Sequence, residues 1–372
     1  MTPDTRQYAA LADHAYDRDG DIASLALRNE RIELGGTIYA VLKHVDNPRT
    51  GYQGTVYQQV DTGAIVVAHR GTEFDREALR DGLADAGMVV ARHNVQIKDA
   101  VELTRWAIGH ARSEEVSGDY SHAPEVTVTG HSLGGTLAQA TAHHFGLRGE
   151  TFNAYGAASL DRRIPEGGHH VLNHVMATDP VSAASPHYGQ VRIYAQPEEI
   201  GRLRAGGYHD NRILDAVTPD LTLVVAGRSF GAHSMHNFLD VDGQGRPDVS
   251  VVRDPASQRL AAQHARTIDN YRDDMNDIRR GVTIGSRGLR GLVEDGVDAI
   301  RGPLPAGEPA TREGASVKPA SERLDKLMLG EVDPAVRAQW EHDVAAHRER
   351  QAQAQVNPAP VRQAAQEMAL GG

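Results

Sequence analysis

The chain has 372 residues, of which 24% are charged, with 39 basic and 50 acidic side chains and a formal net charge of -11 at pH 7. That length is enough to bury a full α/β core, and the acidic balance argues against nucleic acid or an anionic bilayer as a partner held by charge. Cysteine is absent, so disulfides are excluded and the redox compartment is left open.

The first part of the chain alternates apolar runs with turn residues. Residues 8–17 are expected to form a short helix, and residues 37–43 and 54–60 are expected to be strands of an antiparallel edge. This edge leads into a fully apolar strand at residues 64–68, which ends in His69-Arg70-Gly71-Thr72. The pattern predicts a sheet whose antiparallel edge strands precede its other strands in the sequence.

The most informative segment is Gly130-His131-Ser132-Leu133-Gly134. A β-branched run at residues 126–129 enters it, and a helix-forming stretch at residues 136–144 leaves it. Ser132 is therefore expected at a strand-to-helix turn, which is the setting of a nucleophile elbow. Such a turn forces the serine into a strained backbone conformation, and glycines flank it because side chains there would collide across the bend. Ser132 is the predicted nucleophile.

Two donors are predicted for the oxyanion that forms when a serine attacks an acyl group. One donor comes from the residue after the nucleophile and the other from a second strand end. The Leu133 amide lies at an expected helix N-terminus. Thr72 offers a backbone N–H and a hydroxyl, and Gly71 allows the chain to approach closely. Thr72 and Leu133 are the predicted oxyanion hole.

The His69-Arg70-Gly71-Thr72 segment and the Gly-His-Ser-Leu-Gly-Gly elbow together resemble the class 3 lipase family. Its members carry an apolar strand that ends in an aromatic-Arg-Gly-Thr/Ser loop, followed by a GHSLGG elbow. The resemblance covers roughly residues 8–240 and departs from the family at His69, where an aromatic residue is usual. It implies an α/β-hydrolase fold with a mostly parallel sheet and flanking helices, and a serine esterase acting on lipid acyl esters.

The catalytic acid is predicted at the end of a later strand. Residues 170–177 are expected to form a strand that runs into Thr178-Asp179-Pro180-Val181, and catalytic groups collect at the carboxyl ends of strands in open α/β sheets. The family carries its triad aspartate in a similar Asp-Pro-Val setting, so the resemblance assigns the acid to Asp179. The alternative is that Asp179 merely begins a turn before proline.

Among the histidines that follow Asp179, four are candidates for the base, namely His187, His209, His233 and His236. His187 leaves little chain to loop back under the elbow, and His209 lies in a turn-like stretch. Residues 231–239 look like a loop entering a short helix, and bacterial members of the family place the base in a similar His-Ser-Met setting. His233 is therefore the predicted base, and His236 is the alternative, or else a hydrogen-bonding neighbour of the base.

Composition divides the chain into unequal parts. We predict a lipase-like catalytic domain over residues 1–250, a helical extension over 251–300, a linker rich in Pro, Gly, Ala and Ser over 301–320, and a helical or partly disordered tail over 321–372. Within the catalytic domain, residues 196–218 are expected to be a polar insertion.

No metal and no cofactor are expected. The chain holds 19 histidines, and His170 and His174 have i,i+4 spacing. The adjacent histidine pairs, however, lack the carboxylate spacing of a zinc site.

These features predict a carboxylic ester hydrolase of the lipase or phospholipase A1 type. The insertions and the long helical tail suggest the phospholipase A1 subgroup of the family that the chain resembles, and some members of that subgroup are effectors injected into rival bacteria. The partners implied are a lipid substrate and a cognate immunity or export-adaptor protein. No signal-peptide pattern or membrane-spanning apolar run is evident, so we expect a cytoplasmic protein or one exported by a specialised secretion system. A non-hydrolytic scaffold and an acyltransferase are the alternatives.

Overall fold

The computed structural model describes residues 2–16, 20–71, 86–159, 164–210 and 220–281, and for residues 86–94 it describes the backbone alone. All of these residues belong to one compact unit. The predicted linker at 301–320 and the tail at 321–372 lie outside the described residues, as does the end of the extension at 251–300. Those predictions remain predictions.

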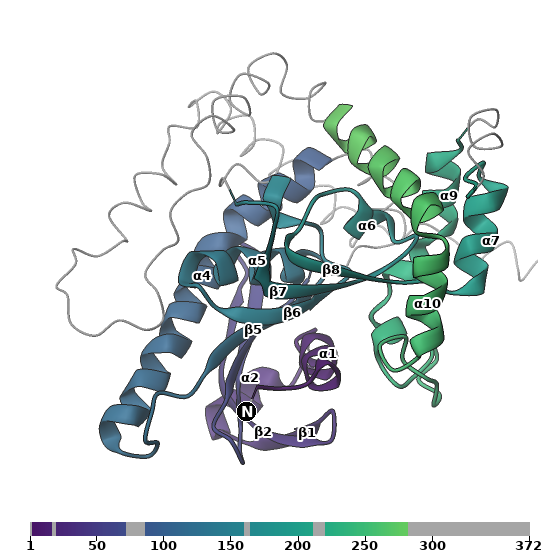
Figure 1. Ribbon diagram of the computed structural model, residues 1–372. Helices are drawn as coiled ribbons and strands as arrows, with labels where there is room; N and C mark the ends of the chain where they lie inside the picture. The colour runs from purple at the N-terminus through teal and green to yellow at the C-terminus, as the bar shows by residue number, and fades with distance from the viewer. Residues whose placement is uncertain (1, 17–19, 72–85, 160–163, 211–219, 282–372) are drawn as a thin grey trace, which may run out of the picture. The chain divides into compact units, whose positions relative to one another are not determined.

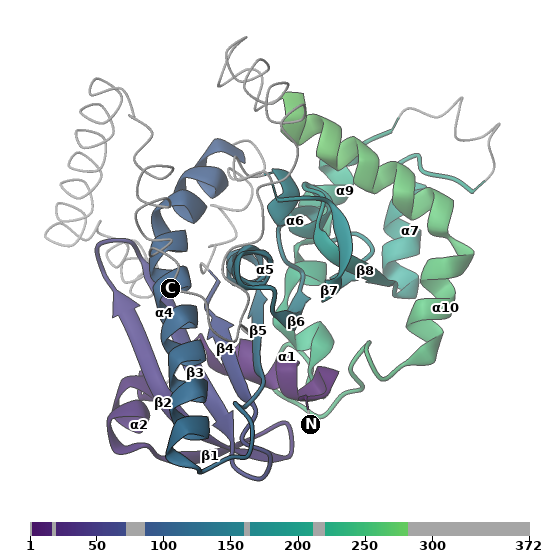
Figure 2. The ribbon, with the colours of Figure 1, turned by 60° about the vertical axis from the view of Figure 1, so that its left-hand side comes forward.

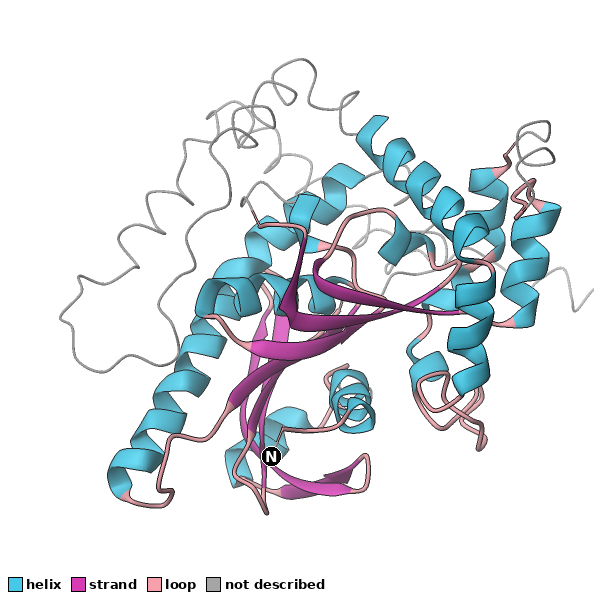
Figure 3. Cartoon of the chain, viewed as in Figure 1, coloured by secondary structure: helices cyan, strands magenta, loops and turns pink. Residues whose placement is uncertain are grey.

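One sheet of eight strands runs through the described residues, and each strand lies beside the next one in the sequence (Figure 1 and Figure 3). The strands are β1 (Arg31–Leu34), β2 (Thr37–Asn47), β3 (Tyr52–Gln59), β4 (Ile65–His69), β5 (Val126–His131), β6 (Arg148–Phe152), β7 (Gly167–Met176) and β8 (Tyr188–Tyr194). Strands β1 to β4 pair antiparallel, and β4 to β8 pair parallel. The predicted antiparallel edge and parallel sheet are both confirmed.

Helices cover both faces of this sheet. They are α1 (Thr5–His14), α2 (Ile22–Arg28), α4 (Ala86–Ser117), α5 (Leu133–Phe145), α6 (Pro180–Ala183), α7 (Pro197–Ala205), α9 (Thr222–Arg228) and α10 (Pro255–Gln263), with 3-10 turns η1 (Ala157–Ser159), η2 (Phe230–His233) and η3 (Met235–Phe238). A further helix spans 265–281. Helices α4 and α5 pack together on one face, and α1 lies on the other (Figure 1 and Figure 2). Right-handed crossovers that always step in one direction put the connecting helices on one side.

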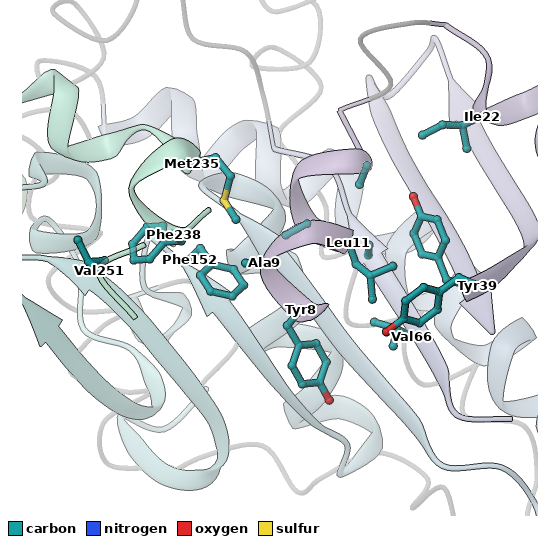
Figure 4. Close-up of a cluster of buried hydrophobic side chains, with 14 of the residues drawn as sticks. Tyr8, Ala9, Leu11, Ile22, Tyr39, Val66, Phe152, Met235, Phe238 and Val251 are labelled. Atoms are coloured by element: carbon teal, nitrogen blue, oxygen red, sulfur yellow. The ribbon is translucent and has the colours of Figure 1, made fainter. Parts of the chain in front are cut away.

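The two faces follow from the alternation of side chains along the strands. In β4, Val66 and Ala68 face a buried cluster with Tyr8, Leu11 and other residues of α1 (Figure 4). His69, on the opposite face of β4, contacts α5 through Thr141. This double burial is why residues 64–68 are apolar throughout.

A second buried cluster joins the end of β7 to α7, α9, α10 and the 265–281 helix. Its members are Ala177, Ala183, Ala195, Ile200, Leu203, Tyr208, Val225, Ala226, Ala261, Ile268, Tyr271 and Met275. The described part of the predicted helical extension is thus helical and supplies core side chains to the same compact unit as the sheet.

The expectation of a polar insertion at residues 196–218 was wrong for the part that the structure describes. Residues 197–205 form α7, and Ile200 and Leu203 are buried in the second cluster. Two apolar residues at i,i+3 are too few to show a helical period among charged neighbours. Residues 211–219 lie outside the described part of the chain.

Candidate active site

Ser132 lies between β5 and α5 with φ 57° and ψ -129°. An L-residue rarely adopts a positive φ, so this turn is strained as the sequence predicted. A Cβ on Gly130 would lie 2.4 Å from the Gly134 carbonyl carbon, and one on Gly134 would lie 2.1 Å from the His69 oxygen. Both contacts are with backbone that cannot move aside. The glycines therefore allow α5 to begin directly against the ends of β4 and β5.

Three side chains from distant parts of the chain meet at this turn. His233 Nε2 lies 3.0 Å from Ser132 Oγ, and His233 Nδ1 lies 2.9 Å from Asp179 Oδ1. Since a carboxylate only accepts hydrogen bonds, Nδ1 carries the proton and Nε2 is free to accept from the serine hydroxyl. All three residues are buried, with 0% of Asp179 and 7% of His233 exposed. The structure thus brings together the predicted nucleophile, base and acid.

Asp179 is placed by the end of β7 and by the start of α6. Its side chain accepts hydrogen bonds from the Val181 and Ser182 amides at 3.1 Å each, which caps the first turn of α6. Burial by itself raises the pKa of this carboxyl, but the His233 imidazole and the Ser182 donors outweigh it and hold the pKa below its ordinary value. Asp179 therefore stays ionised beside the imidazole.

The other histidines do not reach Ser132. His236, the alternative base, has its Nδ1 2.7 Å from the Ser234 hydroxyl, whereas the Ser132 hydroxyl bonds His233. His187 is buried, and its Nε2 donates to the Ser182 carbonyl at 3.0 Å. His209 is half-buried, beyond the end of α7. Of the two histidines that the sequence left as candidates for the base, His233 is the one whose ring lies beside Ser132.

One of the two predicted oxyanion donors can be located. Leu133 is the first residue of α5, and the first amides of a helix have no carbonyl partner within it. Its N–H is therefore available beside Ser132. Thr72 lies outside the described residues. Gly71, just before it, packs closely against the elbow, because a Cβ there would lie 3.2 Å from Ser132 Cβ.

His69, the departure from the family pattern, is fully buried between β3 and α5. Tyr52 Oη lies 2.9 Å from its Nδ1, and Thr141 Oγ1 lies 3.3 Å from its Nε2. Burial lowers the pKa of His69 to about 3, which keeps it neutral. Its role is to fill the space between sheet and helix with a hydrogen-bonded ring.

Sequence reasoning missed several residues that hold the site. His131 and Asn153 donate to carbonyls of the turn that carries His233. Tyr271 and Arg272, from the 265–281 helix, donate to the Thr178 and Ser182 carbonyls on either side of Asp179. The positive φ of Asn153, 42°, has no signal in the sequence. His131 lies inside the elbow motif but gives no sign of its partner.

Two further features of the described residues bear on the site's chemistry. Within the described ranges, no group of three or more His, Asp or Glu side chains could hold a metal ion. No helix in the same ranges combines the length and apolarity needed to cross a bilayer. The groups that the structure does place here are a hydroxyl, an imidazole and a carboxylate in hydrogen-bonded order.

Such an order is the chemistry of acyl transfer. The imidazole can take the serine proton during attack on an ester carbonyl and return it to the leaving group. Together with the mixed sheet and the strand-turn-helix elbow, it is typical of a protein with an α/β-hydrolase-like fold.

Comparison with a family profile gives a more specific similarity. Residues 7–174 match the Tle-like phospholipase domain, described as phospholipase-like. Over these residues the chain is similar to a lipase-like phospholipase family, and this similarity supports lipid ester hydrolysis as the class of activity. The match includes Ser132 and ends before Asp179 and His233.

Solved structures of fungal lipases are also similar to the chain. The Rhizomucor miehei lipase propeptide complex has 15% identity and a TM-score of 0.34, covering 52% of this chain and 68% of that one. Lip2 lipase from Yarrowia lipolytica has 14% identity and a TM-score of 0.35, covering 52% and 78%. No curated protein matches the chain by sequence.

Proposed function

We propose that the chain is a serine esterase that hydrolyses lipid acyl esters through Ser132, His233 and Asp179. The observation that carries this proposal is the buried hydrogen-bonded order of the three groups, at 3.0 Å and 2.9 Å, with the serine held in a strained elbow. A strained and buried polar turn lowers the stability of a protein. Such strain is found mainly where function requires it.

The proposed reaction has two halves. Ser132 Oγ attacks the ester carbonyl while His233 Nε2 takes its proton, and the histidine then gives that proton to the leaving alcohol. Ionised Asp179 stabilises the imidazolium and holds its Nδ1–H. The Leu133 amide, with Thr72 as the second donor, holds the oxyanion. Water activated by the same histidine releases the acyl chain and restores the serine.

For the substrate we propose a glycerophospholipid cut at the first acyl position, as a phospholipase A1. The family match to a phospholipase-like domain supports the phospholipid, and the positional preference follows the class 3 lipase resemblance. We further propose an antibacterial effector role with an immunity or export-adaptor partner, which rests on that resemblance alone.

The test is hydrolysis of a panel of phosphatidyl lipids and triacylglycerols that carry different acyl chains at each position. We expect release of the chain from the first position of phospholipid, and complete loss of release in Ser132→Ala. Release from the second position would overturn the A1 assignment only. Undiminished hydrolysis by Ser132→Ala would overturn the proposed function, and transfer to an added alcohol in preference to water would indicate an acyltransferase.

A further inference from the structure

A hydrogen-bonded chain connects α1 and β5 to the turn that carries His233. The Tyr16 hydroxyl lies 2.6 Å from His131 Nδ1, and His131 Nε2 lies 2.8 Å from the His233 carbonyl oxygen. The rings of His131 and His233 are 4.8 Å apart. Both Tyr16 and His131 are buried. This pair therefore contacts the predicted base through its backbone carbonyl and its ring.

The acceptor decides which nitrogen of His131 carries the proton. A carbonyl oxygen can only accept, so Nε2 must be the N–H that donates to His233. In the neutral ring Nδ1 is then an acceptor, and the Tyr16 hydroxyl is placed to donate to it. Tyr16 therefore favours the one neutral tautomer with which His131 can hold the His233 carbonyl.

The bond from His131 to His233 can fix the position of His233 relative to Ser132, because His131 is covalently joined to Ser132. It ties the backbone of the base to the residue before the nucleophile. The preceding carbonyl, that of Ala232, accepts from Asn153 Nδ2 at 2.7 Å, and Asn153 follows β6. The η2 turn is thus held at two consecutive carbonyls by residues at the ends of two neighbouring strands.

We propose that His131 is a positioning residue that sets the distance between the base and the nucleophile, and that Tyr16 fixes its tautomer. The inference rests on the proposed function, in which His233 is the base. A small displacement of a catalytic group costs much of the rate. Loss of the bond to the His233 carbonyl therefore lowers kcat while leaving KM nearly unchanged.

The first experiment compares two substitutions of His131 on the full chain, with a soluble short-chain ester as substrate. Gln places its side-chain amide where Nε2 of the imidazole lies and can still donate to the His233 carbonyl, whereas Asn is too short. We expect His131→Asn to lose on the order of 100-fold in kcat and His131→Gln to retain most of the wild-type kcat. If His131 served packing alone, the loss of kcat in each variant would follow its loss of melting temperature.

The second experiment uses a matched pair of tyrosines. Tyr194 Oη lies 2.8 Å from Nδ1 of buried His174, so it makes the same kind of bond as Tyr16 but bonds no residue of the site. We expect Tyr16→Phe to lose about tenfold in kcat and Tyr194→Phe to keep wild-type kcat, with similar losses of melting temperature. This pair also decides the matter if a His131 variant does not fold.

Two results overturn the proposal: wild-type kcat in His131→Asn, or equal losses of kcat in the two tyrosine variants. Neither result affects the proposed function, which stands or falls on Ser132→Ala and His233→Ala. Inactivity of those two, with full activity of His131→Asn, would remove the positioning role alone.

Discussion

At the scale of single residues, Asp179 fixes the tautomer of its partner His233 by accepting from Nδ1. In Asp179→Asn the amide can present its N–H to His233 Nδ1, which favours the tautomer that cannot accept from Ser132. We expect kcat to fall by roughly ten-thousandfold, the loss known for the same change in a serine protease. Hydrolysis kinetics and circular dichroism would measure the rate and the retention of the fold.

The control for this prediction is His236, which lies in the next 3-10 turn, η3. His236→Ala removes a ring that bonds Ser234, so it should keep activity within a few-fold, whereas His233→Ala should lose nearly all of it. More than a tenth of wild-type activity in Asp179→Asn would show that Asp179 is not the acid.

Buried neutral histidines make the stability depend on pH. The pKa of His69 is lowered to about 3 and that of His187 to about 4, in both cases chiefly by burial. Below pH 6.5 the unfolded chain therefore binds more protons at these sites, so the free energy of unfolding falls as the pH falls. Each histidine contributes a slope of roughly 1 kcal/mol per pH unit between pH 6.5 and its folded pKa.

His69→Gln tests this slope, since glutamine can keep polar contacts with Tyr52 and Thr141 and does not titrate. Urea unfolding at a series of pH values from 6.5 to 4 should show a shallower decline in the variant than in the wild type. Equal slopes would mean that His69 does not stay neutral in the folded protein.

At the scale of elements, the 265–281 helix supports the loop of the acid. Arg272 donates to the Ser182 carbonyl at 2.8 Å, and the Ser182 amide in turn donates to Asp179. Arg272→Met keeps the apolar stem and removes these donors, so we expect about a tenfold loss of kcat and a loss of about 1–3 kcal/mol in stability. Kinetics and urea unfolding measure the two effects.

The matched control is Arg280, on the same helix, which pairs with Asp277 at the surface. An exposed pair of this kind contributes little, so Arg280→Met should leave both activity and stability close to wild type. If Arg272→Met behaved like Arg280→Met, the helix would have no role in holding the acid.

Local features of the site could be predicted from the sequence, and long-range ones could not. The elbow is encoded within a few residues, since a β-branched run, two small residues and a helix former suffice to define the Ser132 turn. The acid could be placed because Asp179 follows a strand. His233 and His236 are only three residues apart, and which one faces Ser132 depends on the packing of η2 against β5 and β6.

The supports of the site have no local signature. His131 meets His233 across 102 positions of the chain, and Arg272 meets Ser182 across 90. Helix α7 was missed for a related reason, because its two buried apolar residues contact a cluster assembled largely from later parts of the chain. Sequence patterns report which side chains are apolar, whereas the partners are set by the folded arrangement.

At the scale of the whole molecule, we expect two truncations to behave differently. Removal of everything after Asp254 deletes Tyr271 and Met275 from the second buried cluster, and large cavities of this kind cost several kcal/mol each. Removal of everything after Gly302 takes away a segment with few large apolar side chains, which can bury little area. Expression yield, unfolding and hydrolysis measure both.

The shorter chain should be insoluble or inactive, and the chain ending at Gly302 should keep nearly full ester hydrolysis. If the segment after 302 serves export or partner docking, its removal should abolish delivery or binding alone. Loss of hydrolysis in the chain that ends at Gly302 would show that the segment after 302 is part of the catalytic domain.

The most direct measurement of the central claim is covalent labelling by a fluorophosphonate, read by intact mass and peptide mapping. Only a serine activated by a base reacts with such a probe at a useful rate. We predict one adduct per chain, on Ser132, with unchanged labelling in His236→Ala and none in His233→Ala. An unlabelled wild-type chain, or an adduct on another residue, would contradict the assignment of Ser132 and His233 as nucleophile and base.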